Sequence, residues 1–380
     1  MASLEDYAWF VRQMPAAASS VLLGRTRVYA GDWDGNLRAW DSEGERIWDS
    51  EAEDRVERMA GASDAEPPFI CATAGAEVVS FDAANGELRW RHTLGGSSDL
   101  VACTDDGTRI LATSSVYELE FNDFIESTCW RFDGDGEVLR EDPFDERPWH
   151  LLLDGTGLAT MGLGRPRCGL MQQTDDECEH LQLSPDDPIL CGATIDGTTI
   201  FGHASGAVSR LGKSGSGLKT LDKGAEESVL SLACNGVIAI AGGDDGVVRA
   251  VAVKGRARKS FWSQIVGAAV DECTLGFEVA GESSAWVASW DGMRASLHCL
   301  SCGDGSIHMS FEGLPRIRSL TSRADRVAIG LDDGRVILLN EALFNRRISA
   351  SEETDEDSDN LSDETSRRSA LQERLRALRD

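Results

Sequence analysis

A unit of two short apolar strands joined by a tight turn recurs eight times along this 380-residue chain. The clearest pair is VYAGDWDGNLRAW, which starts at Val28, and FICATAGAEVVSF, which starts at Phe69. Further copies begin at Ile110, Gly157, Thr199, Ala239, Val287 and Ala328. Small residues near positions 31, 72, 113, 160, 202, 242, 289 and 330 open the turns and are 40 to 47 residues apart. A chain with this period builds its core by stacking copies of one small unit.

The first two units continue through a second turn to a further strand, which ends in Trp48 and Trp90. Four short strands in about 40–45 residues predict one blade of a β-propeller. We therefore expect an all-β propeller of eight four-stranded blades. The number is seven if the irregular region from Leu151 to Pro188 has been wrongly counted as a blade. Helical repeats are excluded, because most of the 39 glycines fall at turns and would break their helices.

The two ends of the chain predict how the ring closes. The last unit, Ile317 to Asn340, supplies three strands and lacks the outer one. Asp6 to Met14 carries Trp9 and has the pattern of the missing strand. An N-terminal strand in the last blade would pair backbone groups that an open edge leaves bare. Residues 1–345 are therefore expected to form one propeller domain closed by an N-terminal strand.

Two stretches resemble known propeller repeats. AGDWDGNLRAWD, from Ala30 to Asp41, looks like the second and third strands of a WD40 repeat, although the Gly-His dipeptide that opens such repeats is not visible. VVSFDAANGELRW, from Val78 to Trp90, is similar to the repeats of pyrroloquinoline-quinone-type (quinoprotein-like) propellers, in which a Gly turn and a terminal Trp dock one blade on the next. The resemblance covers residues 6–343 and implies an architecture rather than an activity.

The charge of the chain excludes some partners. Its 65 acidic and 37 basic residues give a formal net charge of -28, which repels nucleic acid and anionic membrane surfaces. Only five of the basic residues are Lys, and the other 32 are Arg. This Lys-poor acidic composition resembles proteins of salt-accumulating halophiles, so we expect a haloarchaeal source.

The sequence predicts a cytoplasmic protein. It has no apolar run of about 18 residues, and its first residues show no basic region followed by an apolar core. The ten cysteines are expected to be reduced thiols, because disulfides rarely persist in that compartment.

One stretch imitates a calcium-binding EF-hand loop. Loop positions 1, 3, 5 and 12 are filled by Asp32, Asp34, Asn36 and Glu43. Position 6, which needs a sharp turn, is Leu37, and both flanks alternate like strands rather than helices. Ten Asp-Gly pairs recur along the chain, as expected of type I′ hairpin turns. We therefore interpret Asp34-Gly35 and Ser42-Glu43-Gly44 as two turns of one blade.

Other chemical motifs are weak. Cys299, Cys302 and His308 could be half of a zinc site, but alignment on the repeat places Cys299 on one strand, Cys302 in the turn and His308 on the next strand. No hydrolase, zincin or P-loop motif is present, and the adjacent cysteines of some quinone-dependent propellers are missing. We therefore assign no catalytic, metal or cofactor-binding residues and expect no cofactor.

Most tryptophans fall at repeat positions and are predicted to pack blades together. These are Trp33, Trp40, Trp48, Trp90, Trp130 and Trp290. Trp149 and Trp262 do not fit the repeat and are expected on an exposed rim.

The C-terminal tail lies outside the repeat. Residues 346–366 are interpreted as an acidic disordered linker, because this Ser-rich segment has little apolar surface to bury. Residues 367–380 predict a short amphipathic helix. Its candidate partner-binding residues are Leu371, Arg374, Leu375 and Leu378. A helix of about 14 residues is marginal alone, so it either docks on a surface or frays in solvent.

These observations predict a non-enzymatic scaffold that binds a protein partner of unknown identity. Two alternatives stay open: a propeller that binds a small molecule or a quinone cofactor in its central channel, and a subunit docked into a larger complex through its C-terminal helix. Convergent polar groups with shifted pKa values in the channel would favour the first alternative. A tail helix that crosses to another chain would favour the second.

Overall fold

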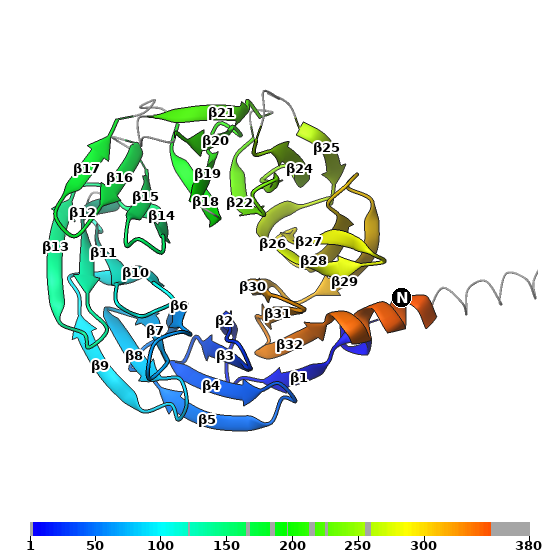
Figure 1. The fold of residues 1–380 in the computed structure, drawn as a ribbon, viewed down its shortest axis with the longest axis horizontal. Coiled ribbons are helices and arrows are strands. Elements are labelled where there is room, and N and C mark those ends of the chain that lie inside the picture. The colour runs from blue at the N-terminus through cyan, green and yellow to red at the C-terminus, as the bar shows by residue number, and fades with distance from the viewer. Residues whose placement is uncertain are drawn as a thin grey trace, which may run out of the picture.

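Eight four-stranded antiparallel sheets form a closed ring in the computed structural model of the protein (Figure 1). The structure describes residues 3–120, 122–164, 168–182, 187–195, 197–212, 217–224, 227–254 and 260–350. The predicted eight-bladed propeller is confirmed, and the seven-bladed alternative is wrong because the region from Leu151 to Pro188 contributes strands to a complete fourth blade.

Each blade contributes one strand to each of four concentric positions. The innermost strands are β2 Ala18–Leu23, β6 Val56–Ala62, β10 Ser97–Cys103, β14 Pro148–Leu153, β18 Ile189–Ile195, β22 Val229–Cys234, β26 Ala269–Val279 and β30 Ile317–Arg323. The second strands are β3 Arg27–Asp32, β7 Phe69–Ala74, β11 Ile110–Glu118, β15 Ala159–Leu163, β19 Thr198–His203, β23 Ile238–Gly243, β27 Glu282–Trp290 and β31 Arg326–Leu331. The third strands are β4 Asn36–Asp41, β8 Glu77–Asp82, β12 Asp123–Phe132, β16 Gly169–Gln173, β20 Val208–Leu211, β24 Val247–Ala252, β28 Ala295–Ser301 and β32 Arg335–Asn340. The outer strands are β5 Arg46–Glu51, β9 Leu88–Thr93, β13 Val138–Phe144, β17 Cys178–Leu181, β21 Leu218–Asp222, β25 Ser260–Ile265, β29 Ile307–Leu314 and, in the eighth blade, β1 Phe10–Gln13.

The small residues of the repeat lie in the second strands, where neighbouring blades approach most closely. A Cβ atom on Gly31 would lie 2.4 Å from Val56 of the next innermost strand, and one on Gly242 would lie 2.3 Å from Val270. Gly330 meets Ala18 of the first blade in the same way, with its Cβ position 2.6 Å from the Ala18 carbonyl oxygen. The 40-residue period therefore marks the interface between blades rather than the turns alone.

At four of the eight junctions, a tryptophan on or just before the outer strand docks one blade on the next. In each case the indole Nε1 donates a hydrogen bond to a backbone carbonyl oxygen in a turn of the next blade. The donor and acceptor pairs are Trp9 and Ser42 (2.8 Å), Trp48 and Ala83 (3.2 Å), Trp90 and Gly134 (3.3 Å), and Trp262 and Cys302 (3.0 Å). The expected docking of Trp48 and Trp90 is thus observed. Trp262 is not an exposed rim residue, because its ring lies against Gly305 of the following blade. Trp33, in the β3–β4 turn, is half exposed, but the Arg318 guanidinium of the eighth blade lies over its ring at 4.5 Å, so it still contacts the neighbouring blade.

The N-terminal strand closes the ring as predicted. β1 pairs antiparallel with β32, from Phe10 opposite Leu338 to Gln13 opposite Arg335. A short 3-10 helix, η1 Leu4–Tyr7, precedes β1 and brings Tyr7 against Phe344, with ring centroids 5.3 Å apart.

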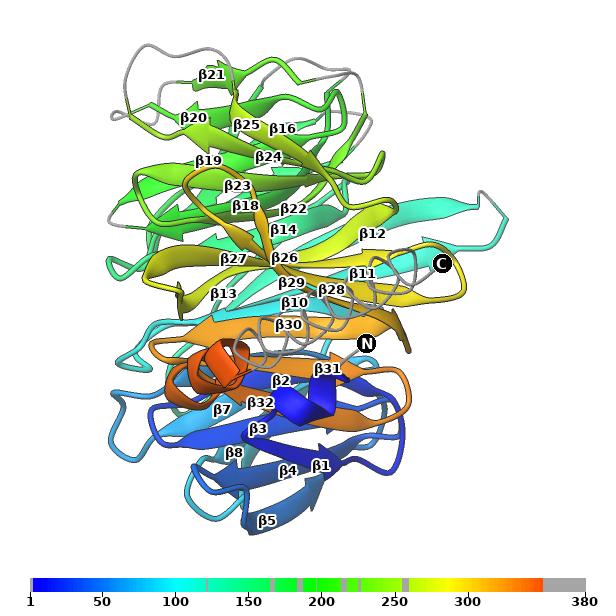
Figure 2. The same cartoon turned by 90° about the vertical axis from the view of Figure 1, so that its right-hand side faces the viewer.

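A helix over residues 341–350 follows β32 and was not anticipated by the sequence analysis (Figure 2). Phe344 anchors this helix against Trp286 and Phe277 of the seventh blade, with ring centroids 5.1 and 5.6 Å apart. The helix includes residues 346–350, the start of the segment interpreted as a linker. The rest of that segment and the expected helix 367–380 lie outside the described residues.

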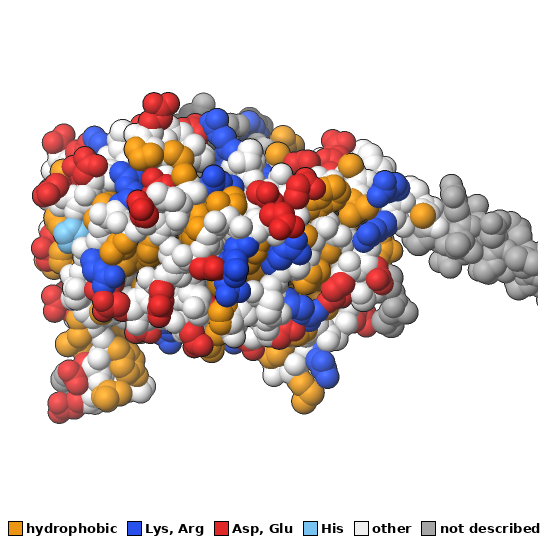
Figure 3. All heavy atoms as spheres, turned by 90° about the horizontal axis from the view of Figure 1, so that it is seen from below, with side chains coloured by type: hydrophobic (Ala, Val, Ile, Leu, Met, Phe, Trp, Pro, Cys, Tyr) orange, Lys and Arg blue, Asp and Glu red, His pale blue; other side chains and the backbone are white. Residues whose placement is uncertain are grey.

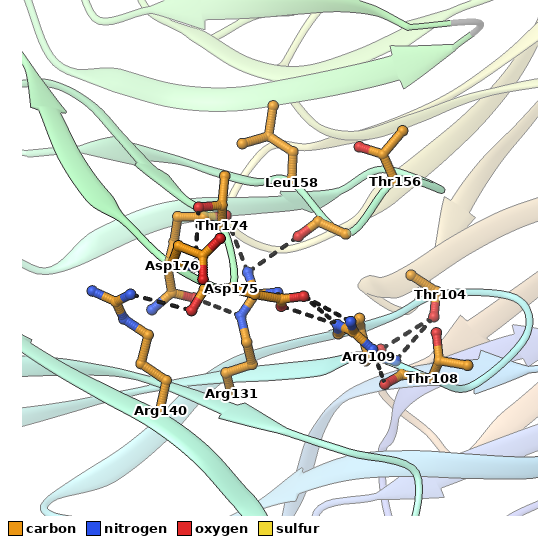
Figure 4. A network of polar contacts seen from close by, with 12 residues as sticks. Thr104, Thr108, Arg109, Arg131, Arg140, Thr156, Leu158, Thr174, Asp175 and Asp176 are labelled. Carbon is orange, nitrogen blue, oxygen red and sulfur yellow. Dashed lines mark hydrogen bonds and ion pairs between the residues drawn. The ribbon is translucent and has the colours of Figure 1, made fainter.

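A buried arginine joins the third and fourth blades (Figure 4). Arg131 on β12 donates to the carbonyl oxygens of Gly157 (3.1 Å) and Gln173 (3.0 Å) and pairs with Asp175 at 2.6 Å. Arg109 binds the same carboxylate at 2.7 Å. Hydrogen bonds from Arg109 lower the pKa of Asp175, despite some desolvation. These partners satisfy the buried guanidinium, and they link the two blades at the junction where the repeat is least regular in sequence.

The Asp-rich loop that resembles an EF-hand in sequence is a β-turn. Gly35 has a φ of +88° and its amide donates to the Asp32 carbonyl at 3.2 Å, whereas Asp34 is not left-handed. The turn is therefore type I followed by a left-handed Gly, not the type I′ turn predicted. The Asp32 carboxylate accepts the amides of Asp34 and Asn36 at 3.0 and 2.8 Å. The carboxylate oxygens of Asp32 therefore act as hydrogen-bond acceptors within the turn.

Candidate functional site

Each innermost strand carries a β-bulge near its first residues. The register skips one residue in every blade, namely Ser19, Glu57, Asp99, Trp149, Leu190, Leu230, Asp271 and Arg318. Because strands alternate in direction, these bulges lie toward the face that also carries the β11–β12 connection, which we call the hairpin face. A bulge redirects the side chains beside it, which is why bulges recur at binding sites.

Side chains that follow the bulges line a cavity of about 340 Å³ in the centre of the ring. Arg58 comes from the second blade, His150 from the fourth and Glu272 from the seventh, and we call these three the channel cluster. The Arg58 Nη1 atom lies 4.0 Å from a Glu272 carboxylate oxygen. The rest of the lining is largely aliphatic, with Leu100, Leu151, Leu190, Leu230 and Leu232.

Enclosure in the channel wall shifts both titratable groups of the cluster toward their neutral forms. Burial raises the pKa of Glu272 to about 7, with a further increase from Asp271 and an opposing effect of Arg58. The 29% of this side chain that remains exposed faces the lumen. Burial also lowers the pKa of His150 to about 4, and the positive charge of Arg58 adds to the decrease. Near neutral pH the channel cluster therefore offers one cation, one neutral imidazole and one carboxyl group close to its titration point.

Two thiols of the same cavity are poor nucleophiles. Burial raises the pKa of Cys191 far above its usual range and that of Cys273 to about 12. A thiol that stays protonated neither attacks a substrate nor binds a metal readily. Among the described residues, no group of three His, Cys, Asp or Glu side chains is placed to hold a metal ion. Neither thiol of the cavity is therefore activated for nucleophilic attack.

A cleft of about 290 Å³ adjoins the channel cavity. Trp149 and Leu190 line both spaces, and Phe124 and Arg147 complete the cleft. The Arg147 guanidinium lies over the Phe124 ring at 4.4 Å and pairs with Asp99 at 2.7 Å. We call this site the Trp149 cleft. Trp149 is exposed, as the sequence analysis expected.

The second and third strands of the third blade extend into a projecting hairpin. β11 and β12 have nine and ten residues, whereas β3 and β4 of the first blade have six each. The hairpin stands out from the ring in Figure 2, and Figure 3 shows apolar side chains on it at the lower left. Its exposed apolar residues, which we call the hairpin tip, are Tyr117 (44% exposed), Leu119 (84%) and Ile125 (46%).

The hairpin tip is held in shape by its own contacts. The Tyr117 hydroxyl donates to the Asn122 side-chain oxygen at 2.8 Å, and its ring meets Phe124 edge-on at 5.1 Å. Phe124 belongs to the Trp149 cleft, so the tip, the cleft and the channel cavity form one continuous surface on the hairpin face.

The residues singled out in the sequence lie elsewhere. The candidate partner-binding residues Leu371, Arg374, Leu375 and Leu378 are outside the described part of the chain. The zinc alternative is resolved as the repeat alignment predicted, with Cys299 on β28, Cys302 in the following turn and His308 on β29. None of the channel cluster was anticipated, although aligning the repeats at positions 58, 150 and 272 would have shown Arg, His and Glu in a column that otherwise holds Ser, Leu and Cys.

The geometry defines a closed eight-bladed propeller with a polar cluster in its channel and an apolar projection on one face. No known family model matches the sequence, and no curated protein matches it. Among solved structures, Sqt1 from Saccharomyces cerevisiae is 10% identical with a TM-score of 0.72, covering 90% of this chain and 99% of its own. BamB from Moraxella catarrhalis is 15% identical with a TM-score of 0.64, and the C-terminal WD40 domain of Sif2 is 14% identical with a TM-score of 0.65. Each of these two covers 87% of this chain and 98% of its own.

At these identities the shared property is the fold. The chain therefore has the fold of WD40-like and BamB-type β-propellers. In the described residues, no helix is long and apolar enough to cross a membrane.

Proposed function

We propose that this protein is a non-enzymatic scaffold that binds a protein partner through its hairpin face. The observation that carries the proposal is the hairpin tip, where Tyr117, Leu119 and Ile125 expose apolar surface on a projecting ribbon. Exposed apolar side chains that cluster on a rigid element are typical of interaction sites. Tyr117 is already fixed by Asn122 and Phe124, which lowers the entropy lost on binding.

The experiment is crosslinking and capture from native lysate at high salt, followed by mass spectrometry. Leu119→Glu combined with Ile125→Glu should remove the partner that the unaltered protein retains. Val237→Glu is the matched control, because Val237 is 66% exposed but lies in the β22–β23 turn on the opposite face. Equal capture by all three proteins would reject the hairpin tip as the binding surface.

Partner binding through the C-terminal tail is a separate proposal within the same scaffold function. A chain that ends at residue 350 lacks Leu371, Arg374, Leu375 and Leu378. If this truncation loses every partner while the hairpin variant retains them, partner binding belongs to the tail, as expected of a subunit docked through its C-terminal helix. If both proteins keep the same partner, neither surface is required.

The channel cluster supports a second candidate function, the binding of a small molecule in the ring centre. Arg58, His150 and Glu272 converge on one cavity, and the pKa values of His150 and Glu272 are shifted, which meets the criterion for a binding site of this kind. Native mass spectrometry of the purified protein should then reveal a bound small molecule. Leu230→Trp, which places a large ring in the cavity, should abolish that signal; its persistence would place the molecule elsewhere.

A further inference from the structure

A second pocket lies on the face opposite the hairpin, between the first and second blades. It encloses about 310 Å³ and is lined by the β2–β3 and β6–β7 connections, by the turn after β8 and by Arg323 at the end of β30. Tyr29, Phe69 and Ile70 form an apolar floor and are themselves buried. We call this site the arginine pocket, after Arg25, Arg27 and Arg323 in its lining.

Two of these guanidinium groups form no ion pair with a carboxylate of the residues that the structure describes. Arg27 donates to the Ala83 carbonyl, and Arg323 donates to the Leu23 carbonyl at 3.4 Å and the Ser63 hydroxyl at 3.3 Å. Within the part of the chain that the structure describes, neither has a carboxylate oxygen within 4.0 Å of its nitrogens. Arg25 does pair with Asp64, but its side chain remains largely exposed. The long bonds of Arg323 leave it free to turn toward a ligand.

A neighbouring arginine fixes the wall of the pocket. Arg326 donates to the carbonyl oxygens of Gly24 and Arg25 at 2.8 and 2.7 Å, which holds the β2–β3 connection from the eighth blade. The pocket mouth is therefore built by three blades and preorganised before any ligand binds. Positive charge gathered in this way is unusual on a chain whose net charge is -28, since it opposes the field of the rest of the surface.

The chemistry of the lining selects the ligand. Planar guanidinium groups bind carboxylates and phosphates through paired hydrogen bonds. The aromatic and aliphatic floor favours an apolar, preferably planar, body attached to the anion. The net negative charge of the protein repels any anion at long range, so contacts with an apolar body must contribute to binding.

We propose that the arginine pocket binds an organic anion that carries one carboxylate or phosphate group on a planar apolar body. This site lies on the face opposite the proposed partner surface and does not depend on it. The volume of the pocket accommodates a two-ring aromatic acid.

The test uses 2-naphthoate as the probe and the full chain as the receptor, with binding followed by isothermal titration calorimetry. 2-Naphthylmethanol keeps the apolar body without the charge, and inorganic phosphate keeps an anion without the body. Both should bind at least tenfold more weakly than 2-naphthoate. Equal binding of the neutral analogue would reduce the site to an apolar pocket, and equal binding of phosphate would reduce it to a general anion site; either result overturns the proposal.

Two variants assign the binding to this pocket. Arg323→Gln should weaken 2-naphthoate by about tenfold, the loss expected for one charge-assisted contact. Arg55→Gln is the matched control, since it removes the same charge from an exposed side chain on the hairpin face and should leave the affinity unchanged.

Ala84→Trp fills the pocket without removing a charge and should abolish binding. This variant keeps the proposal testable if Arg323→Gln disturbs the junction between blades, which thermal unfolding would reveal. Unchanged affinity in both Arg323→Gln and Ala84→Trp, or no heat of binding for the unaltered protein at millimolar probe, would overturn the assignment.

Discussion

Burial of the ionisable Glu272 side chain in the channel lowers the stability of the folded protein. Its pKa of about 7 lies above the value of about 4.3 expected in an unfolded chain. Below pH 4 both states are protonated, but as pH rises toward 7 the unfolded state loses its proton first. The native state is therefore progressively destabilised over this window, by up to ~3 kcal/mol, and the loss is complete above pH 7.

Glu272→Gln removes this titration while keeping the shape of the side chain. We expect a higher melting temperature than in the unaltered protein at pH 8, and little difference at pH 4.5. Glu87→Gln, in the exposed turn after β8, is the matched control and should change neither value. Thermal unfolding at both pH values decides the matter: an equal gain at pH 4.5 and pH 8 would show that ionisation of Glu272 is not the cause.

Substituting Gly136 and Gly292 by Ala distinguishes two ways in which a Cβ atom lowers stability: backbone strain and steric clash. Both have left-handed backbones, with φ of +87° and +95°. A Cβ on Gly136 would lie 2.5 Å from the Trp90 ring, whereas nothing lies within 4 Å of one on Gly292. Gly292→Ala should cost about 1–2 kcal/mol for the conformation alone. Gly136→Ala should cost about 1–3 kcal/mol more, because the docked indole must move. Urea unfolding measures both, and equal losses would mean that the Trp90 contact stabilises little.

At the scale of single elements, β1 is the strand whose removal opens the ring. It pairs with β32 and places Trp9 and Phe10 against the first blade. Deletion of residues 1–14 should lower the free energy of unfolding by several kcal/mol, since it exposes the edge of β32 and removes buried Phe10 and Met14. Chemical denaturation is the measurement, and deletion of residues 351–380 is the comparison. An unchanged midpoint after loss of residues 1–14 would contradict closure by β1.

Blade count and closure were predictable because they rest on signals that every repeat carries. Apolar alternation, turn glycines and the Trp residues at 48 and 90 recur at one period, and the missing outer strand of the last unit pointed to Trp9. The helix over residues 341–350 was missed, because Phe344 is helical only where Trp286 and Phe277 offer a surface. Tertiary packing decides such short helices.

The candidate sites were less predictable, since each depends on where the ring brings distant residues together. A β-bulge adds one residue without a compositional signal, and the skipped residues Glu57, Trp149 and Leu190 share no chemistry. Arg58, His150 and Glu272 belong to three blades and meet only across the channel. The projecting hairpin had one visible trace, the 47-residue spacing between positions 113 and 160, which marks an insertion in the third unit.

At the scale of the whole molecule, the candidate sites lie on two opposite faces of one closed ring. The hairpin face carries the channel cluster, the Trp149 cleft and the hairpin tip, while the opposite face carries the arginine pocket. Adjacent blades pack closely through the small residues of the second strands and, at four junctions, through a docked tryptophan, so neither face is expected to change shape when the other is occupied. A ligand in the arginine pocket and a partner on the hairpin face should therefore bind independently.

The net charge of -28 sets how this ring responds to salt. Raising the ionic strength from 0.1 to 1 M shortens the Debye length from about 10 to 3 Å, which weakens repulsion among the acidic side chains. It also weakens exposed Arg–carboxylate pairs such as Arg46–Asp49, but each contributes only ~0–1 kcal/mol. Because acidic residues outnumber basic ones by 65 to 37, relief of repulsion should win. We expect the melting temperature to rise by several degrees in both NaCl and KCl. An isosmotic sucrose series, which leaves the ionic strength unchanged, is the control: a similar rise there would assign the effect to solvent exclusion, and a melting temperature that falls with salt would contradict both the repulsion argument and the expected halophilic source.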